Sequence, residues 1–341
     1  MTVHIGLVGA GNISDTHARA IAGIPDAAIA AVYSPTLGHA ERLAGRFGAA
    51  AYDTLDRFLD HRPMNMVTIG TPSGRHGVHG IAAARRGLHV LVEKPIETTV
   101  AKADALIAEA ARAGVTLGVI FQDRLKPSVR RLKAIVDACR LGRPILASAR
   151  VKWHRPPEYY RASRWRGTSE LDGGGALINQ AVHTVDLLIW LGGPVRRVYG
   201  RLATRLHDIE VEDTAVAVLE FAAGGLGTVE AATSAYPGSA RRIELTGSEG
   251  TAILEGDRLI ALDLRDASGA GDVDPPDDRP ESATSPVVSD PAAHRAVFED
   301  FMRAVATGGS PACDGAEGRR SVALIEAVYR ASLTTAPVDL A

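Results

Sequence analysis

The sequence has little cysteine, few aromatic residues and almost no net charge. Its 341 residues include only two cysteines, Cys139 and Cys313, and aromatic residues make up 5%. Two cysteines far apart in the sequence do not make a disulfide framework, so we expect a cytoplasmic protein. A net charge of −2 gives no reason to expect nucleic acid or an anionic membrane as a partner.

Long hydrophobic runs are also missing. No uninterrupted apolar stretch of about 18 residues occurs, so we expect no membrane span. Residues 1–5 (MTVHI) lead directly into an apolar strand pattern, without the basic region and apolar run of a signal peptide. Residues 267–290 are rich in Asp, Pro, Ser and Gly, which is typical of a long surface loop.

What is present is an ordinary globular composition, with 46% hydrophobic residues, in a chain long enough for two domains. In the first third, short apolar runs alternate with helical patterns. The apolar runs are residues 3–8, 28–33, 66–69, 89–92 and 115–121, and the helical segments include 17–21, 40–47, 78–86 and 100–113. This alternation predicts a parallel sheet covered by helices on both faces, in an α/β domain.

The pattern changes after residue 122. An amphipathic helix is predicted over 127–139, another helix over 174–191, and two more near 291–306 and 316–332. Strands are predicted over 145–153, 195–202, 214–221, 227–233, 242–246, 251–254 and 259–264, several of them separated by short turns. Short turns between successive strands indicate a largely antiparallel sheet in an α+β domain. We therefore divide the chain into domains 1–123 and 124–341.

A glycine motif connects the first strand to the first helix. Gly9-Ala10-Gly11-Asn12-Ile13-Ser14 has the G-x-G-x-x-G pattern with serine in the last position. Small residues there permit a tight turn close to a pyrophosphate, and the helix N-terminus offers free N–H groups. This context favours a dinucleotide site over a glycine-rich turn without a ligand.

The turn after the second strand bears on the choice of cofactor. An acid in this turn would bind the ribose hydroxyls of NAD, but the chain reads Tyr33-Ser34-Pro35-Thr36. Ser34 and Thr36 could donate to a 2′-phosphate, yet the nearest downstream arginine is Arg42. We expect NAD(P), with NADP mildly favoured.

Two further motifs follow strands of the predicted parallel sheet. Thr71-Pro72-Ser73 and His76 follow the strand at 66–69, and Glu93-Lys94-Pro95 follows the strand at 89–92. Ligands of open α/β sheets bind at this carboxyl edge. An ammonium there could hold a substrate hydroxyl or exchange a proton with it. The alternatives are an ordinary turn with a solvated histidine and a surface lysine at a strand end.

A polar stripe is predicted on the helix over 174–191. Asn179, His183 and Asp186 have i, i+4, i+7 spacing and follow Gly173-Gly174-Gly175. Histidine is the usual acid–base residue near neutral pH, although a lone histidine is often structural. Asn179 and Asp186 make a poor zinc ligand set with it, so we expect no metal.

These motifs, in this order, resemble the Gfo/Idh/MocA family, named for glucose–fructose oxidoreductase and inositol dehydrogenase. The resemblance is carried by the Gly9–Gly11 turn, Thr71-Pro72-Ser73 with His76, Glu93-Lys94-Pro95, and the glycine run leading to His183. It covers essentially the whole chain. It implies a Rossmann domain, a second domain with an open antiparallel sheet, and packing of that sheet in dimers or tetramers.

The resemblance assigns Lys94 and His183 to the catalytic centre. Many relatives carry an aspartate four residues before the histidine, where this chain has Asn179. The departure removes an ionised partner from the lysine–histidine system and leaves an amide that can position a sugar hydroxyl. The expected cofactor-binding residues are Gly9, Gly11, Asn12, Ile13, Ser34, Thr36, Thr71, Pro72, His76, Glu93 and Lys94.

The segment between the second domain's first strand and the glycine run is rich in aromatic residues and arginine. Aromatic faces suit sugar rings and arginine suits hydroxyls or carboxylates, although packing of the loop explains each residue as well. The expected substrate-binding residues are Lys94, Gln122, Arg124, Trp153, Tyr160, Trp165, Arg166, Asn179 and His183.

The expected function is hydride transfer between a nicotinamide and a hydroxyl or keto carbon of a sugar, sugar derivative or cyclitol. A regulator of the same fold that binds dinucleotide or sugar without catalysis is the alternative, and the presence of both Lys94 and His183 argues against it.

Overall fold

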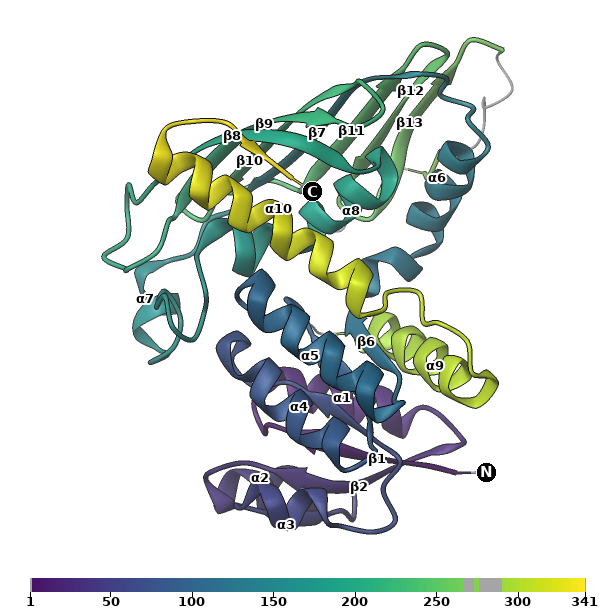
Figure 1. The fold of residues 1–341 in the computed structure, drawn as a ribbon, viewed down its shortest axis with the longest axis vertical. Coiled ribbons are helices and arrows are strands. Elements are labelled where there is room, and N and C mark those ends of the chain that lie inside the picture. Colours follow the sequence, from purple (N-terminus) through teal and green to yellow (C-terminus); the bar gives the residue numbers. More distant parts are fainter. Residues whose placement is uncertain (1, 267–272, 276–289, 341) are drawn as a thin grey trace. The chain divides into compact units, whose positions relative to one another are not determined.

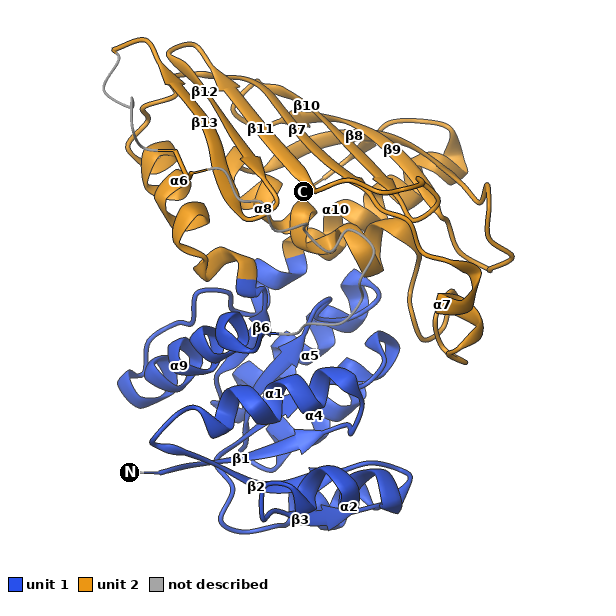
Figure 2. Cartoon of the chain, turned by 180° about the vertical axis from the view of Figure 1, so that it is seen from behind, with its two compact units in different colours: residues 1–122, 287–319 blue, residues 123–286, 320–341 orange. Residues whose placement is uncertain are grey.

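The computed structural model describes residues 2–266, 273–275 and 290–340. The chain forms two compact units, one of residues 1–122 and 287–319 and one of 123–286 and 320–341 (Figure 2). The division expected from the sequence, 1–123 and 124–341, placed residues 287–319 in the second domain, whereas they belong to the first unit. The surface loop expected over 267–290 lies outside the described residues, except for 273–275 and 290.

The first unit contains a parallel sheet of six strands in the order β3-β2-β1-β4-β5-β6. Its strands are β1 (Val3–Val8), β2 (Ala27–Tyr33), β3 (Ala50–Tyr52), β4 (Met66–Ile69), β5 (His89–Glu93) and β6 (Leu117–Ile120). This is the expected Rossmann sheet, and its strand order reverses between β1 and β4. Ligands of such sheets bind beyond the carboxyl ends of the strands at that reversal.

The returning segment completes the core of the first unit. The N–H of Val119 in β6 donates to the carbonyl of Cys313 at 2.9 Å, and Gly118 forms a bridge with Asp314. A Cβ atom at Gly118 would lie 2.6 Å from the ring of Phe301, so glycine is needed for α9 (Ala292–Thr307) to pack this closely on β6.

The second unit contains a sheet of eight strands in the order β13-β12-β11-β7-β10-β9-β8-β14. Its strands are β7 (Pro144–Lys152), β8 (Val195–Ala203), β9 (Thr214–Phe221), β10 (Leu226–Ala232), β11 (Arg242–Gly247), β12 (Gly250–Glu255), β13 (Arg258–Leu264) and β14 (Val338–Asp339). Only β7 and β10 pair in parallel, and the other neighbours are antiparallel. The expected, largely antiparallel sheet is therefore confirmed.

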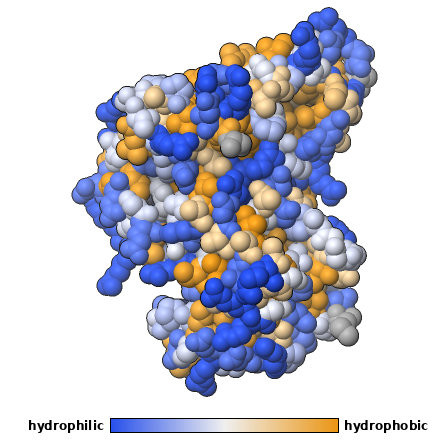
Figure 3. All heavy atoms as spheres, viewed as in Figure 1, coloured by the Kyte–Doolittle hydropathy of each residue, from blue (hydrophilic) through white to orange (hydrophobic). Residues whose placement is uncertain are grey.

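The two faces of this sheet differ in exposure. The buried face includes Ala215, Ala217 and Gly200, and α10 (Gly315–Thr334) packs closely there, since a Cβ at Gly200 would lie 2.6 Å from the Val328 side chain. The other face exposes Leu146, Val216 and Val218, among others. Hydrophobic atoms reach the upper edge in Figure 3, where strands of this sheet lie in Figure 1.

The helices expected from the sequence are present, and α3 and α7 occur in addition to them. They are α1 (Asn12–Ala22), α2 (Leu37–Gly45), α3 (Leu55–Leu59), α4 (His76–Arg85), α5 (Val100–Ala113), α6 (Pro127–Asp137), α7 (Pro157–Arg161), α8 (Val182–Gly192), α9 and α10 (Gly315–Thr334). The predicted helix over 174–191 begins as a π-helix, Ala176–Ala181, before α8. None of the helices in the described part of the chain is long and apolar enough to cross a membrane.

Candidate active site

The glycine turn after β1 leaves the N-terminus of α1 open. Gly9 has a φ of 113°, and a Cβ there would lie 2.9 Å from the carbonyl oxygen of Gly70. Gly11 is the N-cap residue, and a Cβ there would have no atom within 4 Å from the described residues that are not its neighbours along the chain. The first turn of α1 contains Asn12 and Ile13. Its free N–H groups therefore suit the pyrophosphate of a dinucleotide.

Ser14 occupies the position of the third glycine in the motif. Its side chain is 1% exposed, and its Oγ has no hydrogen-bond partner in the described structure. A Cβ at Gly70 would lie 3.0 Å from that Oγ, so the turn after β4 packs directly on this residue. Only a small side chain fits between helix and sheet here, which explains how serine can replace glycine.

The turn after β2 contains no acid and uses its serine internally. The Oγ of buried Ser34 accepts a hydrogen bond from the Thr36 N–H at 3.3 Å. Thr36 and Arg42 are exposed. Thr36 is therefore the more accessible hydroxyl of the two that the sequence suggested for a 2′-phosphate.

His76 connects two of the strand-end turns. Its Nε2 lies 2.9 Å from the carbonyl oxygen of Thr71 and its Nδ1 lies 2.8 Å from that of Pro95. Burial lowers the pKa of His76, although the two carbonyls partly oppose that effect. With 1% of the residue exposed, this geometry favours a brace between the turns over direct contact with a cofactor.

Glu93, the residue before Lys94, fixes the backbone of Lys94. One carboxylate oxygen accepts from His17 Nε2 at 2.9 Å and lies 3.6 Å from His294 Nε2. The other accepts from the backbone N–H of Lys94 at 3.1 Å. Burial alone would raise the pKa of Glu93, but His17 and His294 hold it well below its usual range. Lys94 itself is half-buried directly after β5.

His17, Glu93 and His294 have ligand atoms within 4.8 Å of one another, a spacing that could hold a metal ion. Hydrogen bonds explain the same arrangement. The second ring nitrogen of His17 lies 3.2 Å from the hydroxyl of Thr68, so both of its nitrogens are engaged. His294, which enters from α9, could not be connected to this motif by sequence spacing.

In the second unit, a buried carboxylate caps the π-helix. Glu212 accepts from the N–H groups of Gly175 and Leu177, both at 2.9 Å, and from the Tyr329 hydroxyl at 3.0 Å. Burial raises the pKa of Glu212. A Cβ at Gly175 would lie 1.7 Å from the Glu212 carbonyl oxygen, so the glycine run is required for this close approach.

Asn179 lies in a chain of polar contacts on the π-helix. Its amide nitrogen donates to the buried carboxylate of Asp172, and its oxygen accepts from Gln180 Nε2 at 2.7 Å. Gln180 in turn accepts from Arg155 at 2.8 Å. The sequence pattern identified Asn179 but not Asp172, because Asp172 lies in a turn before the glycine run, outside the helix whose spacing predicted the polar stripe.

Asp186, the third residue of the predicted stripe, forms a buried ion pair. Its two carboxylate oxygens accept from Arg124 Nη2 at 2.7 Å and Nε at 2.8 Å, and the two residues are 1% and 3% exposed. The Arg124 guanidinium also lies 5.2 Å from the centre of the Trp190 ring. This contact gives Arg124 a structural role, and its expected substrate contact remains a prediction.

The aromatic segment forms a cluster with two arginines. The Arg166 guanidinium lies 4.2 Å from the ring centre of Tyr159, and that of Arg155 lies 5.0 Å from that of Trp153. Burial raises the pKa of Tyr160 to about 12, and its hydroxyl donates to Thr233 at 2.9 Å.

Two more of the expected substrate-binding residues, Trp165 and Gln122, are half-buried. The side-chain oxygen of Gln122 has no hydrogen-bond partner among the described residues.

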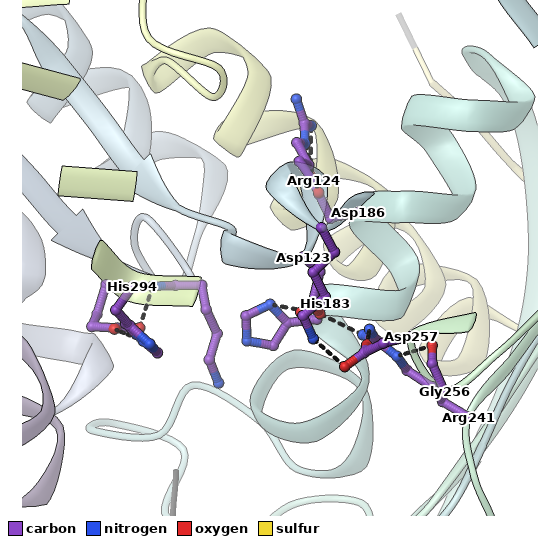
Figure 4. Close-up of polar contacts among 11 residues, drawn as sticks. Asp123, Arg124, His183, Asp186, Arg241, Gly256, Asp257 and His294 are labelled. Atoms are coloured by element: carbon purple, nitrogen blue, oxygen red, sulfur yellow. Dashed lines mark hydrogen bonds and ion pairs between the residues drawn. The ribbon is translucent and has the colours of Figure 1, made fainter. Parts of the chain in front are cut away.

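His183 has a carboxylate neighbour that the sequence did not suggest. The Oδ2 of Asp123 lies 3.7 Å from Nδ1 of His183, and Asp123 is 4% exposed. Figure 4 draws these residues as one connected group with Arg241 and Asp257. No spacing rule connects positions 123 and 183, since they come from different elements.

Comparisons with known proteins show which family the chain belongs to. Residues 3–121 match the oxidoreductase family with an NAD-binding Rossmann fold, and residues 129–253 match the GFO/IDH/MocA C-terminal domain. The WlbA dehydrogenase from Bordetella pertussis, solved with NADH and UDP-GlcNAcA, is 31% identical with a TM-score of 0.88, covering 100% of this chain and 99% of that one. The chain belongs to the GFO/IDH/MocA family.

Other GFO/IDH/MocA proteins are similar over most or all of their length. The rhizopine catabolism protein MocA of Rhizobium meliloti is 32% identical, covering 73% of this chain and 77% of its own. Inositol 2-dehydrogenase of Rhizobium meliloti is 26% identical over the full length of both chains. The chain is thus an NAD(P)-dependent oxidoreductase, and the family expected from its motifs is confirmed.

Proposed function

We propose that this enzyme transfers a hydride between a nicotinamide and a hydroxyl or keto carbon of a sugar, sugar derivative or cyclitol, with Lys94 and His183 as its catalytic residues. The observation that carries the proposal is Lys94 at the carboxyl end of β5, with its backbone N–H fixed by Glu93. Ligands of a Rossmann sheet bind beyond the carboxyl ends of its strands, so a side chain that directly follows β5 is placed to act on a bound ligand.

The chemistry of each group determines its role in the reaction. A bound nicotinamide supplies the hydride acceptor or donor. The ammonium of Lys94 donates to the substrate oxygen and stabilises the negative charge that develops there. The imidazole of His183 takes the hydroxyl proton in oxidation and returns it in reduction.

The substrate class is proposed from the relatives and from the aromatic segment. Relatives are named for inositol, levoglucosan and xylose, and the WlbA dehydrogenase was solved with UDP-GlcNAcA. Trp153, Tyr160 and Trp165 offer ring faces of the kind that sugars contact, and Arg166 offers hydrogen-bond donors. Gln122 and Asn179 add amides that can bind hydroxyl groups.

A substrate screen tests the proposal against the alternative of a regulator. NAD and NADP are each supplied with myo-inositol, levoglucosan, xylose or UDP-GlcNAcA, and formation of reduced nicotinamide is followed by its absorbance. Turnover that disappears in Lys94→Ala and His183→Asn supports the proposal. Tight binding of dinucleotide without turnover of any sugar in either direction would favour the regulator.

Cofactor preference is expected to be mild, with NADP favoured or both accepted, and Ser34→Asp should shift it toward NAD by about tenfold or more. The new carboxylate would accept from the ribose hydroxyls and repel a 2′-phosphate, while it can still accept the Thr36 N–H. Dissociation constants for NAD and NADP measure the shift.

Ser34→Asn is the matched control, because it adds similar bulk without charge and should change the preference little. No acid lies between Tyr33 and Thr36. If the wild-type protein bound NAD about 100-fold more tightly than NADP, another group would have to discriminate between the ribose hydroxyl and the 2′-phosphate.

A homodimer or homotetramer through the exposed face of the eight-stranded sheet is also proposed. Val218 and Leu226 are 49% and 52% exposed there, and Val218 is opposite Tyr199 in the register of β9 and β8. Several apolar side chains on one exposed face indicate an interaction surface.

Val218→Lys is expected to weaken the association by about 100-fold or more, because it places a charge from each subunit in the interface. Size-exclusion chromatography with light scattering would report the change. Val78→Lys alters an exposed valine of α4 and should leave the assembly intact. An unchanged oligomer in Val218→Lys would rule out this face.

A further inference from the structure

A buried charged cluster lies beside His183 in the second unit. Asp123 belongs to the short turn Gln122–Leu125 that follows β6, and its Oδ2 is 3.7 Å from Nδ1 of His183. That separation is an ion-pair distance, slightly longer than a hydrogen bond. Catalytic hydrogen bonds are often this long without substrate and shorten when it binds.

Two cations hold the Asp123 carboxylate in its charged form. Lys126 Nζ lies 2.7 Å from Oδ1, and Arg241 donates to Oδ2. Burial alone would raise the pKa of Asp123, but the charges of Arg241, Lys126 and His183 hold it well below its usual range. Near neutral pH, His183 therefore faces an ionised carboxylate.

Arg241 is itself fixed in place. It is 9% exposed, its Nε donates to the carbonyl of Gly256 at 3.1 Å, and its Nη2 donates to Asp257. Arg241 thus holds Oδ2 of Asp123, the oxygen nearest His183, which limits the movement of the carboxylate. The group is drawn in Figure 4.

The residue one helical turn before His183 carries no charge. Asn179 is an amide that donates to Asp172 and accepts from Gln180. Asp123 is a carboxylate within ion-pair distance of the His183 ring, and it comes from a different element of the fold. A histidine that exchanges protons commonly has such a partner on its second nitrogen, which fixes the tautomer.

We propose that Asp123 is a positioning residue for His183: its carboxylate keeps the proton on Nδ1 and leaves Nε2 to exchange a proton with the substrate hydroxyl. This rests on the proposed function, in which His183 is the acid–base group. In oxidation, the hydroxyl proton goes to Nε2 as the hydride leaves carbon for the nicotinamide. The imidazolium that forms is stabilised by Asp123, and reduction reverses both transfers.

Asp123→Asn tests the proposal, because it keeps the shape and removes the charge. We expect kcat to fall by about 10²–10⁴-fold, with KM and the cofactor dissociation constant near their wild-type values. Turnover is followed with whichever screened sugar is converted, from myo-inositol to UDP-GlcNAcA.

A second measurement needs no substrate. Nitrogen-15 NMR of protein labelled at histidine reports the tautomer of the ring whose signals disappear in His183→Asn. The wild type should carry its proton on Nδ1, and Asp123→Asn should lose that preference. Asp257→Asn removes an acid from the same two cations and should keep the wild-type tautomer.

If Asp123→Asn does not fold, Asp123→Asn/Arg241→Gln removes both members of the buried pair and should show the same loss. A folded variant with wild-type kcat and an unchanged tautomer overturns the inference, and the proposed function stands if His183→Asn is inactive. If His183→Asn keeps wild-type turnover, the proposed function fails and the inference fails with it.

Discussion

Lys94→Ala is expected to lower kcat by about 10²–10⁴-fold while the dissociation constant of the cofactor changes little. The cofactor is expected to be held mainly by the glycine turn at the start of α1, whereas the ammonium acts on the substrate oxygen. Steady-state kinetics together with cofactor titration separate the two effects.

The control for this variant is Lys102→Ala. Lys102 lies in α5 of the same unit, is 51% exposed, and pairs with Glu97 at 4.0 Å. Its removal should leave kcat near that of the wild type, because no motif places it at the carboxyl edge of the sheet. An unchanged kcat in Lys94→Ala would remove this lysine from the mechanism.

Arg124→Ala is expected to lower the free energy of unfolding by about 3–5 kcal/mol. The substitution leaves the Asp186 carboxylate, 1% exposed, without its bidentate partner, and an isolated buried charge is costly. Denaturant titration followed by circular dichroism measures the loss. A double variant, Arg124→Met/Asp186→Leu, should recover much of it, because it leaves no charge unpaired.

Arg319→Ala is the matched control for the ion pair. Arg319 pairs with Asp104 at a surface where the side chains are 38% and 50% exposed. Exposed pairs contribute about 0–1 kcal/mol, so this variant should unfold nearly as the wild type does. If Arg124→Ala proved equally mild, the buried pair would not be a main support of α8.

The fold could be predicted from the sequence where local patterns decide it. The runs at residues 3–8 and 66–69 became β1 and β4 with the same bounds, because fully apolar strands between helices have few alternatives. The short β3 and α3 were missed, since three and five residues give too little periodicity.

The residues around the site were harder to predict. Strand ends and a glycine motif identified Gly9 and Lys94, because these positions follow from local sequence. Asp123 and His294 were missed, because each reaches its partner across a long stretch of chain. The π-helix was missed as well, since its start depends on Glu212, which follows it by more than thirty residues.

The return of residues 287–319 to the first unit has a consequence for how the protein is made. During synthesis, β6 and the Glu93 carboxylate leave the ribosome long before His294, Phe301 and Cys313, which complete their surroundings. Until then the nascent Rossmann unit has an unpaired sheet edge and an apolar notch at Gly118, features that favour aggregation. Contacts between residues so far apart in sequence also slow folding. The first unit to be translated therefore cannot be completed until the chain has been made as far as residue 319, after most of the second unit.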